Sequence, residues 1–322
     1  MPAPCDLLLT ADLLLPQDDA RREISDAAVA IAHGRIAALG PAAEVVPAFT
    51  PARRLDLGRA LLMPGLVNAH THAAMTMFRG LADDLPLLDW LHRAIFPVEA
   101  RLVPAMVRLG ARIACAEMTR TGTTCFLDGY LFTDEVLAAA GDAGLRCTAG
   151  EGLFAFPNPA FPDAFAALDH TRRRAERLAG SELLRQCVLP HSIYTTTPEI
   201  MHAAWELAEE LGIPFVTHLA ESPGETAQVM ERHGVRPVEF MRREGLLGPH
   251  ALLAHCVDLL PQEIDVLAAS GAAVAHCPES NAKLASGFAP VAAMLRAGIR
   301  VGLGTDGPAS NNDLNMLGEM NA

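Results

Sequence analysis

The stretch MPGLVNAHTHAAM, residues 63–75, places two histidines at the end of an apolar run. His70 and His72 are two positions apart, so on a β-strand both side chains lie on the same face. The pair alone leaves two interpretations open: a buried strand that happens to contain histidine, or the first half of a metal site. A lone histidine in such a strand is more often a hydrogen-bonded core residue, so the choice depends on the rest of the chain.

The composition limits the classes of partner and compartment. The chain has 322 residues, 51% of them hydrophobic, and a formal net charge of −13. That charge argues against nucleic acid and anionic membranes as partners, because both bind basic surfaces. The seven cysteines are scattered without a CxxC motif, which is typical of free thiols in a reducing compartment. With no secretory signal and no apolar run of membrane-spanning length, we expect a cytoplasmic protein.

Two regions of different pattern follow one another along the chain. Residues 1–61 contain short apolar runs broken by turn pairs, which predict a small β-rich domain. In residues 62–322, apolar runs alternate with segments of helical period, which indicates an α/β fold with a parallel sheet covered by helices. The strand candidates are residues 61–72, 122–128, 145–153, 186–193, 213–221, 251–257, 272–278 and 300–307. Eight strands favour a closed (β/α)8 TIM-like barrel, and the absence of a GxGxxG turn argues against an open doubly wound sheet.

The sequence ends at Ala322, shortly after the last strand candidate. A closed barrel ordinarily continues into a helix at this point. We therefore expect a barrel truncated after its eighth strand, and a poorly folding, inactive fragment is one alternative for this length of chain.

Polar residues recur at the ends of the strand candidates, where barrels of this class build their active sites. Three imidazoles and one carboxylate form a ligand set suited to one divalent metal, with Zn²⁺ the first choice and Fe²⁺ the second. The four candidate ligands are His70, His72, His218 and Asp306. Together they favour the metal site over the buried-strand interpretation.

Two further residues near this set predict proton transfer. Glu221 follows His218 by three positions, so it must reach back from a loop, and a non-ligand carboxylate is what a metal-dependent aminohydrolase uses to carry a proton. His255 lies in an otherwise apolar strand, where burial would keep it neutral and able to orient the attacking hydroxide.

Five longer motifs contain most of these residues: PGLVNAHTHAAMTMFRGLADD, LDWLHRAIFPVEA, VTHLAES, HCPESNAKLASG and GTDGPASNNDLNMLGEM. From about residue 5 to the end, the chain resembles the amidohydrolase superfamily. The closer resemblance is to its 5-methylthioadenosine/S-adenosylhomocysteine deaminases, which are grouped with the triazine hydrolases and chlorohydrolases. The resemblance also implies that residues 1–61 are the N-terminal part of a small β-sandwich domain, whose C-terminal half is expected to be absent from this sequence.

The resemblance implies roles for individual residues. It assigns metal binding to the same four ligands and proton handling to Glu221, His255 and Asp306. Glu99 of PVEA would bind the ribose hydroxyls, and His191 of LPHSIY would contact the purine. Trp90, Ser280 and Asn281 are candidates for the pocket lining, with a packing role equally open for each.

Two departures from the wider superfamily refine these expectations. The fourth strand offers His191 and no lysine, which favours one metal over a pair bridged by a carboxylated lysine. The segment FAFPNPAFPDAFAALDH after the third strand has four phenylalanines and no lysine or arginine. It suits a methylthio group better than a homocysteine carboxylate, for which Arg79 is the candidate cation.

The expected function is hydrolytic deamination of 5′-methylthioadenosine, S-adenosylhomocysteine or both. The alternatives are a related aminohydrolase or chlorohydrolase acting on a triazine, guanine, cytosine or pterin, and a non-catalytic metal-binding scaffold. Members of the family are often dimers or tetramers, so a homo-oligomer is one expectation for the quaternary state.

Overall fold

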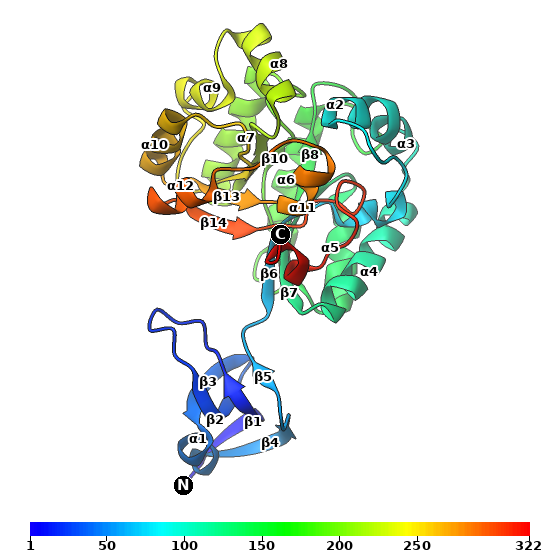
Figure 1. Ribbon diagram of the computed structural model, residues 1–322. Helices are drawn as coiled ribbons and strands as arrows, with labels where there is room; N and C mark the ends of the chain where they lie inside the picture. Colours follow the sequence, from blue (N-terminus) through cyan, green and yellow to red (C-terminus); the bar gives the residue numbers. More distant parts are fainter. The chain divides into compact units, whose positions relative to one another are not determined.

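The computed structural model describes residues 1–322 and divides them into two compact units, Met1–Gly65 and Leu66–Ala322 (Figure 1). The small unit is a mixed sheet of order β3-β2-β1-β4, with β5 paired to β1; β2 pairs antiparallel with β1 and β3, and β4 and β5 pair parallel with β1. Its strands are β1 (Ala3–Leu14), β2 (Ile24–Ala32), β3 (Arg35–Pro41), β4 (Phe49–Asp56) and β5 (Leu61–Leu62), and α1 (Ala42–Ala48) links β3 to β4. The tight turn between β2 and β3 uses His33 and Gly34, both at positive φ, as two-residue hairpin turns require.

The larger unit is an α/β fold built on two parallel sheets, which confirms the predicted parallel α/β class. One sheet has the order β10-β8-β7-β6, with β9 paired to β8, and the other has the order β11-β12-β13-β14. Its strands are β6 (Leu66–Thr71), β7 (Thr123–Tyr130), β8 (Arg146–Leu153), β9 (Leu184–Gln186), β10 (Leu189–Pro190), β11 (Phe215–Leu219), β12 (Ala251–His255), β13 (Ala273–His276) and β14 (Arg300–Leu303).

The two sheets of the larger unit are connected at both edges by isolated parallel bridges. Val188 pairs with Phe215 and Ser192 with His218 at one edge, and Thr71 pairs with Asp306 at the other. The predicted fourth strand, residues 186–193, is divided between β9 and β10, so only its first and central parts are regular strand. Pro190 has no N–H to donate to a neighbouring strand, which accounts for the early end of β10.

Helices follow most of the parallel strands and pack around them (Figure 1). After β6 come the 3-10 turn η1 (Ala73–Phe78), α2 (Leu87–Trp90), the π-helical turn η2 (Leu91–Ile95), α3 (Phe96–Glu99) and α4 (Pro104–Arg120). The remaining helices are α5 (Thr133–Ala143), α6 (Ala164–Leu178), α7 (Pro198–Leu211), α8 (Pro223–His233), α9 (Pro237–Arg243), α10 (Pro261–Ser270), α11 (Pro278–Lys283), α12 (Val291–Arg296) and α13 (Met316–Glu319).

Local sequence sets the ends of these helices. Proline occupies the first turn of α4, α7, α8, α9, α10 and α11, where its missing N–H has no helical partner to lose. Glycines at positive φ end four helices, because only glycine adopts the left-handed cap without strain. These are Gly144, Gly212, Gly234 and Gly271, after α5, α7, α8 and α10.

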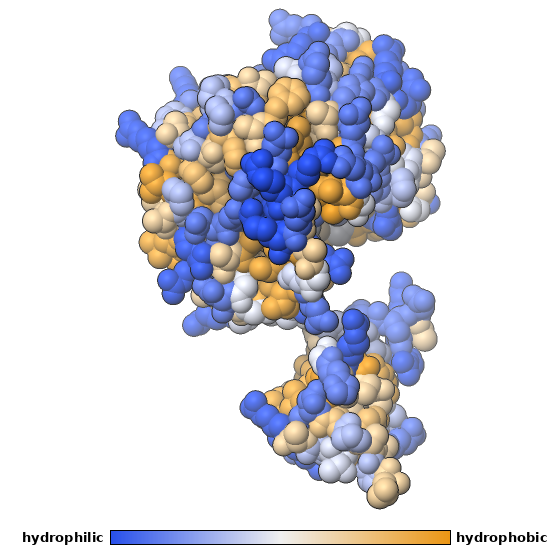
Figure 2. Space-filling view, turned by 180° about the vertical axis from the view of Figure 1, so that it is seen from behind, coloured by the Kyte–Doolittle hydropathy of each residue, from blue (hydrophilic) through white to orange (hydrophobic).

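The surface of the larger unit is chemically mixed. Figure 2 shows hydrophilic residues over much of the face turned to the viewer, with hydrophobic areas between them. The longest helix, α4, has 17 residues, and none of the helices combines the length and the apolar character needed to cross a membrane.

Candidate active site

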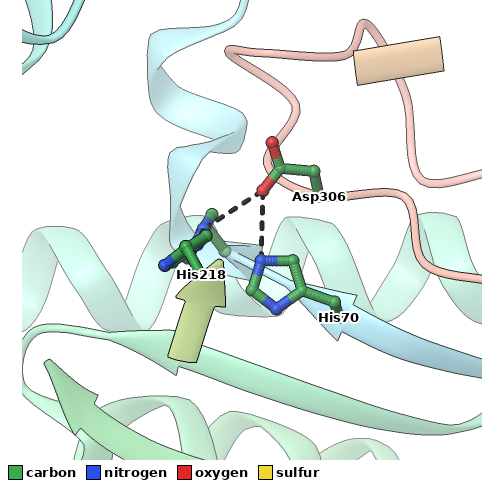
Figure 3. A group of neighbouring side chains, drawn as sticks. His70, His218 and Asp306 are labelled. Carbon is green, nitrogen blue, oxygen red and sulfur yellow. Dashed lines mark hydrogen bonds and ion pairs between the residues drawn. The ribbon is translucent and has the colours of Figure 1, made fainter. Parts of the chain in front are cut away.

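The four predicted metal ligands come together at the carboxyl ends of β6, β11 and β14. Their ligand-type atoms all lie within 4.8 Å of one another. Nε2 of His72 is 3.2 Å from Nε2 of His218, and Oδ1 of Asp306 is 3.1 Å from Nε2 of His72 and 3.4 Å from Nε2 of His70. Figure 3 shows the Asp306 carboxylate facing the imidazoles of His70 and His218, which come from different segments. Three nitrogens and one oxygen therefore converge on a single point.

Atoms that face this point lack hydrogen-bond partners in the protein. Nε2 of His70 and Oδ1 of Asp306, which lie 3.4 Å apart, are buried and unpaired. An unsatisfied buried polar group costs about 1–3 kcal/mol, so this grouping indicates a ligand that the side chains themselves do not supply. Three imidazoles with one carboxylate match the donor set and number of a single divalent metal. The residues present thus fit one metal ion.

Backbone carbonyls orient two of the imidazoles. Nδ1 of His218 donates to the carbonyl oxygen of His191 at 2.6 Å, and Nδ1 of His72 donates to the carbonyl oxygen of Gly129. A carbonyl can only accept, so each Nδ1 carries the proton and each Nε2 presents its lone pair to the centre of the group. Hydrogen bonds of this kind fix the tautomer and ring orientation of metal-binding histidines.

The Asp306 carboxylate is held by two serine hydroxyls. Ser280 donates to Oδ2 at 2.7 Å and Ser310 donates to the same oxygen at 2.5 Å. Burial disfavours the charged form of Asp306, but the imidazoles of His70 and His72 close to Oδ1 outweigh it, so the pKa lies well below the usual range. The carboxylate is therefore ionised, with Oδ1 left to face the histidines.

Glycines allow the Asp306 segment to approach β6. A Cβ on Gly304 would lie 2.8 Å from the backbone nitrogen of His70, a separation that no side chain tolerates without a backbone shift. The backbone nitrogen of Asp306 donates to the carbonyl oxygen of His70 at 3.0 Å. Asp306 itself adopts φ 57°, a left-handed conformation that is strained for a residue with a side chain.

Glu221 and His255 lie beside the metal-ligand group. Nε2 of His255 is 3.8 Å from Oε2 of Glu221, and both side chains are buried. Nδ1 of His255 is hydrogen-bonded to Oδ1 of Asn281 at 2.9 Å. This bond makes Nδ1 the donor, so the unpaired Nε2 carries a lone pair.

The environments of these two groups shift their pKa values in directions useful for proton transfer. Burial lowers the pKa of His255, which keeps the ring neutral. Burial, followed by the nearby charge of Asp306, raises the pKa of Glu221 to about 8. At neutral pH Glu221 therefore holds a proton and can donate it.

A cavity opens onto the metal-ligand group. Trp90, Glu99 and His191 are among its lining residues, together with Glu221 and His255. Trp90 is buried, and Glu99 and His191 are half-buried. Burial raises the pKa of the Glu99 carboxyl and lowers that of the His191 imidazole to about 3.

Two residues predicted as candidates for the pocket lining contact other site residues and not the cavity. Ser280 and Asn281 are almost fully buried at the start of α11 and do not line the cavity, since their side chains bind Asp306 and His255. Arg79, the candidate cation, is paired with Glu117 at 2.6 Å and also lies outside the lining.

The outer part of the cavity is aromatic and apolar. Phe96, Phe154, Phe156, Pro157 and Pro159 line this outer cavity, which shares Phe96, Glu99, Leu131 and Phe154 with the inner one. Neither part has lysine or arginine in its lining. The sequence indicates this aromatic segment, and the structure adds which side of the site it faces.

Two residues of the site, Ser310 and Glu225, are not among those predicted from the sequence. Ser310 had no local signal, because its contact with Asp306 depends on the fold of the segment after β14. Glu225 lies on α8 and accepts hydrogen bonds from the turn that carries Glu221. The Ser222-x-x-Glu225 spacing of a capping box was a signal for it.

The sequence is similar to that of known metal-dependent hydrolases. Residues 61–322 match the model of the Amidohydrolase family. The 5-methylthioadenosine/S-adenosylhomocysteine deaminase of Nitratidesulfovibrio vulgaris is 56% identical over 320 residues, which cover 99% of this chain and 73% of the relative. The enzyme of the same name from Lawsonia intracellularis is 46% identical over 316 residues, covering 98% and 72% of the two chains.

Solved structures show the same similarity. An adenosine deaminase from Xanthomonas campestris with bound zinc has a TM-score of 0.95 at 39% identity, covering 99% of this chain and 73% of that chain. The atrazine chlorohydrolase of Arthrobacter aurescens, complexed with zinc, has a TM-score of 0.90 at 26% identity, covering 98% and 75%.

Proposed function

This chain belongs to the amidohydrolase family, and we propose that it catalyses metal-dependent hydrolytic deamination of an adenine nucleoside. The substrate is 5′-methylthioadenosine, S-adenosylhomocysteine or both, and the products are the inosine analogue and ammonia. The observation that carries the proposal is the buried pair of Glu221 and His255 beside a four-ligand metal group on the wall of a cavity. The names of the similar deaminases support the nucleoside as substrate.

The proposed architecture is a (β/α)8 barrel with residues 1–61 as part of a small β-sandwich domain. The bridges that join the two parallel sheets at both edges support closure of the barrel. A closed barrel gathers the carboxyl ends of all its strands at one face, which is where the proposed site residues would be needed.

The proposed metal is a single divalent ion held by His70, His72, His218 and Asp306, with zinc favoured because both similar structures contain it. When bound, such an ion lowers the pKa of water toward 7 and supplies a nucleophile at neutral pH. The protein contributes two imidazoles, His72 and His218, whose orientation is set by backbone carbonyls, and an ionised carboxylate.

The proton steps are assigned to three residues of this chain. The Asp306 carboxylate, whose pKa lies well below the usual range, accepts the proton of the attacking water. His255 presents the lone pair of Nε2 to the water and orients it toward C6 of the purine. Glu221 protonates N1 of the ring, which makes C6 electrophilic, and Asp306 then delivers its proton to the departing ammonia. The proton of the new C6 hydroxyl returns to Glu221, which leaves the C6 carbonyl of the inosine analogue and restores the acid.

The substrate is held by the remaining cavity residues. Glu99 accepts hydrogen bonds from the ribose hydroxyls, His191 contacts the purine, and Trp90 packs against the bound nucleoside. The aromatic outer cavity takes the 5′ substituent. Because its lining offers no cation to a carboxylate, we favour the methylthio group over the homocysteine chain.

Ammonia release from a panel of compounds tests this function. The panel contains 5′-methylthioadenosine, S-adenosylhomocysteine, adenosine, guanine, cytosine and melamine, with metal analysis of the same sample. We expect turnover of the adenine nucleosides and about one metal ion per chain. Full metal occupancy without activity on any nucleoside would overturn the proposal.

A further inference from the structure

Glu225 holds the turn between β11 and α8 through two backbone hydrogen bonds. Its Oε1 accepts the backbone N–H of Ala220 at 3.1 Å, and its Oε2 accepts that of Glu221 at 2.7 Å. The Glu225 side chain is fully buried. Both carboxylate oxygens are thus used on the two peptide groups that lead into Glu221.

These bonds differ from ordinary helix capping. In a capping box, the residue at the third helical position accepts the N–H of the N-cap residue itself. Glu263 does so in α10, where its side chain accepts the N–H of the N-cap residue Leu260 at 2.7 Å. Glu225 occupies the same position in α8, whose N-cap is Ser222, but it reaches one and two residues further back. Its hydrogen bonds therefore act on the turn rather than on the helix end.

The turn is held from its other side as well. The carbonyl oxygen of Ala220 accepts the N–H groups of Val257 and Asp258, each at 2.9 Å. Ala220 adopts φ 50°, a left-handed conformation that costs a non-glycine residue of order 1–3 kcal/mol unless its surroundings enforce it. The hydrogen bond from the Ala220 N–H to the Glu225 carboxylate helps to stabilise this conformation.

The carboxyl group of Glu221 has no hydrogen bond of its own to another protein group, and its Oε2 lies 3.8 Å from Nε2 of the neutral His255. Its location therefore depends on the backbone from which it projects. We propose that Glu225 is a positioning residue that sets the Glu221 carboxylate for proton transfer. This inference rests on the proposed function, in which Glu221 is the proton donor.

Replacing Glu225 by glutamine removes one acceptor and turns an N–H₂ donor toward a backbone N–H. The turn then loses a hydrogen bond, and Glu221 shifts relative to N1 of the substrate. Misplacement of a reacting group by about 1 Å lowers rates up to roughly 100-fold. We expect Glu225→Gln to lower kcat roughly 10- to 100-fold, with KM and metal content close to those of the unchanged protein.

A double-mutant cycle separates positioning from general loss of structure. The variants are Glu225→Gln, Glu221→Gln and the pair, each assayed for kcat, KM and metal content. If Glu225 acts through Glu221, then Glu225→Gln has no further effect once Glu221 is glutamine. Glu263→Gln is the matched control, since it changes the same helix position in α10, and we expect its kcat to match that of the unchanged protein.

The outcomes of the cycle are distinct. An equal loss of kcat from Glu225→Gln in both backgrounds, or no loss at all, would overturn the positioning role. Near-normal turnover of Glu221→Gln alone would instead overturn the proton-donor role of Glu221 on which the inference rests, whereas absence of activity on every nucleoside in the unchanged protein would overturn the proposed function. If Glu225→Gln does not fold, Glu225→Asp takes its place in the cycle, because it keeps both oxygens on a shorter side chain and the same non-additivity is expected.

Discussion

At the scale of single residues, the site holds two carboxylates whose pKa values are moved in opposite directions. Histidine neighbours keep the pKa of Asp306 well below its usual range, whereas burial raises that of Glu221 to about 8. When the pKa values of two neighbouring carboxyl groups differ in this way, one is ionised and can act as a base at neutral pH, and the other is protonated and can act as an acid. Here Asp306 is the base and Glu221 is the acid. The division matches the roles proposed for deamination.

Glu221→Gln tests the acid directly. Glutamine keeps the size of the side chain but cannot protonate N1, so we expect kcat to fall roughly 1,000-fold, within the range for loss of a general acid. Metal content and melting temperature should not change, because Glu221 is not among the four grouped ligands. Turnover near that of the unchanged protein would remove Glu221 from the mechanism.

The pH dependence of the rate follows from the raised pKa of Glu221. The carboxyl keeps its proton below about pH 8 and loses it above, so the donor disappears as pH rises. We expect kcat/KM to decline on the alkaline side, by about tenfold per pH unit once past the pKa. A pH–rate profile from 6 to 10 checks this, and an alkaline limb that persists in Glu221→Gln would assign it to another group.

Glu99→Ala distinguishes nucleoside from free-base substrates. The proposed contact is to the ribose, which a base or a triazine lacks, so the variant should lose about 10- to 100-fold in kcat/KM on nucleosides. Steady-state assays on methylthioadenosine and guanine provide the comparison. An equal loss on both compounds would place Glu99 outside ribose recognition.

At the scale of elements, the approach of the β14 segment to β6 depends on glycine. Gly304→Ala would drive a Cβ to 2.8 Å from the His70 backbone nitrogen. We expect a loss of about 1–3 kcal/mol in the free energy of unfolding together with a lower metal content, measured by calorimetry and elemental analysis. Gly141→Ala in α5 is the control, because its Cβ would meet only the Leu184 side chain at 3.4 Å. Equal metal content in the two variants would contradict the expectation.

At the scale of the whole molecule, the metal-ligand group joins segments far apart in sequence. Its members come from β6, β11 and the segment after β14. An ion bound there stabilises only the folded chain, by about 4 kcal/mol when its concentration is roughly 1,000 times Kd. The unpaired buried atoms of His70 and Asp306 are the groups that gain a partner.

Metal removal therefore affects both stability and activity. We expect a chelator to abolish ammonia release and to lower the melting temperature, with both restored by added Zn²⁺. Calorimetry and activity assays on the same dialysed samples provide the measurement. An unchanged melting temperature in a sample proven free of metal would contradict the stabilising role.

Much of the fold was predictable because its signals are local. Each strand candidate from 61–72 to 300–307 overlaps a strand of the larger unit, since apolar runs and helical periods arise from neighbouring residues. The candidate ligands were predictable for the same reason: each ends or directly follows such a run. The closed barrel and the roles of the individual site residues stay predictions.

The sequence by itself determined the parallel α/β class and the chemistry of the metal-ligand group, because strand period and residue type do not depend on distant partners. Only the tertiary structure decided which side chains support that group. It turned Ser280 and Asn281 toward Asp306 and His255, and it joined Glu225 to the turn that carries Glu221. Such contacts form where segments meet in space, and the order of residues along the chain does not record where that will be.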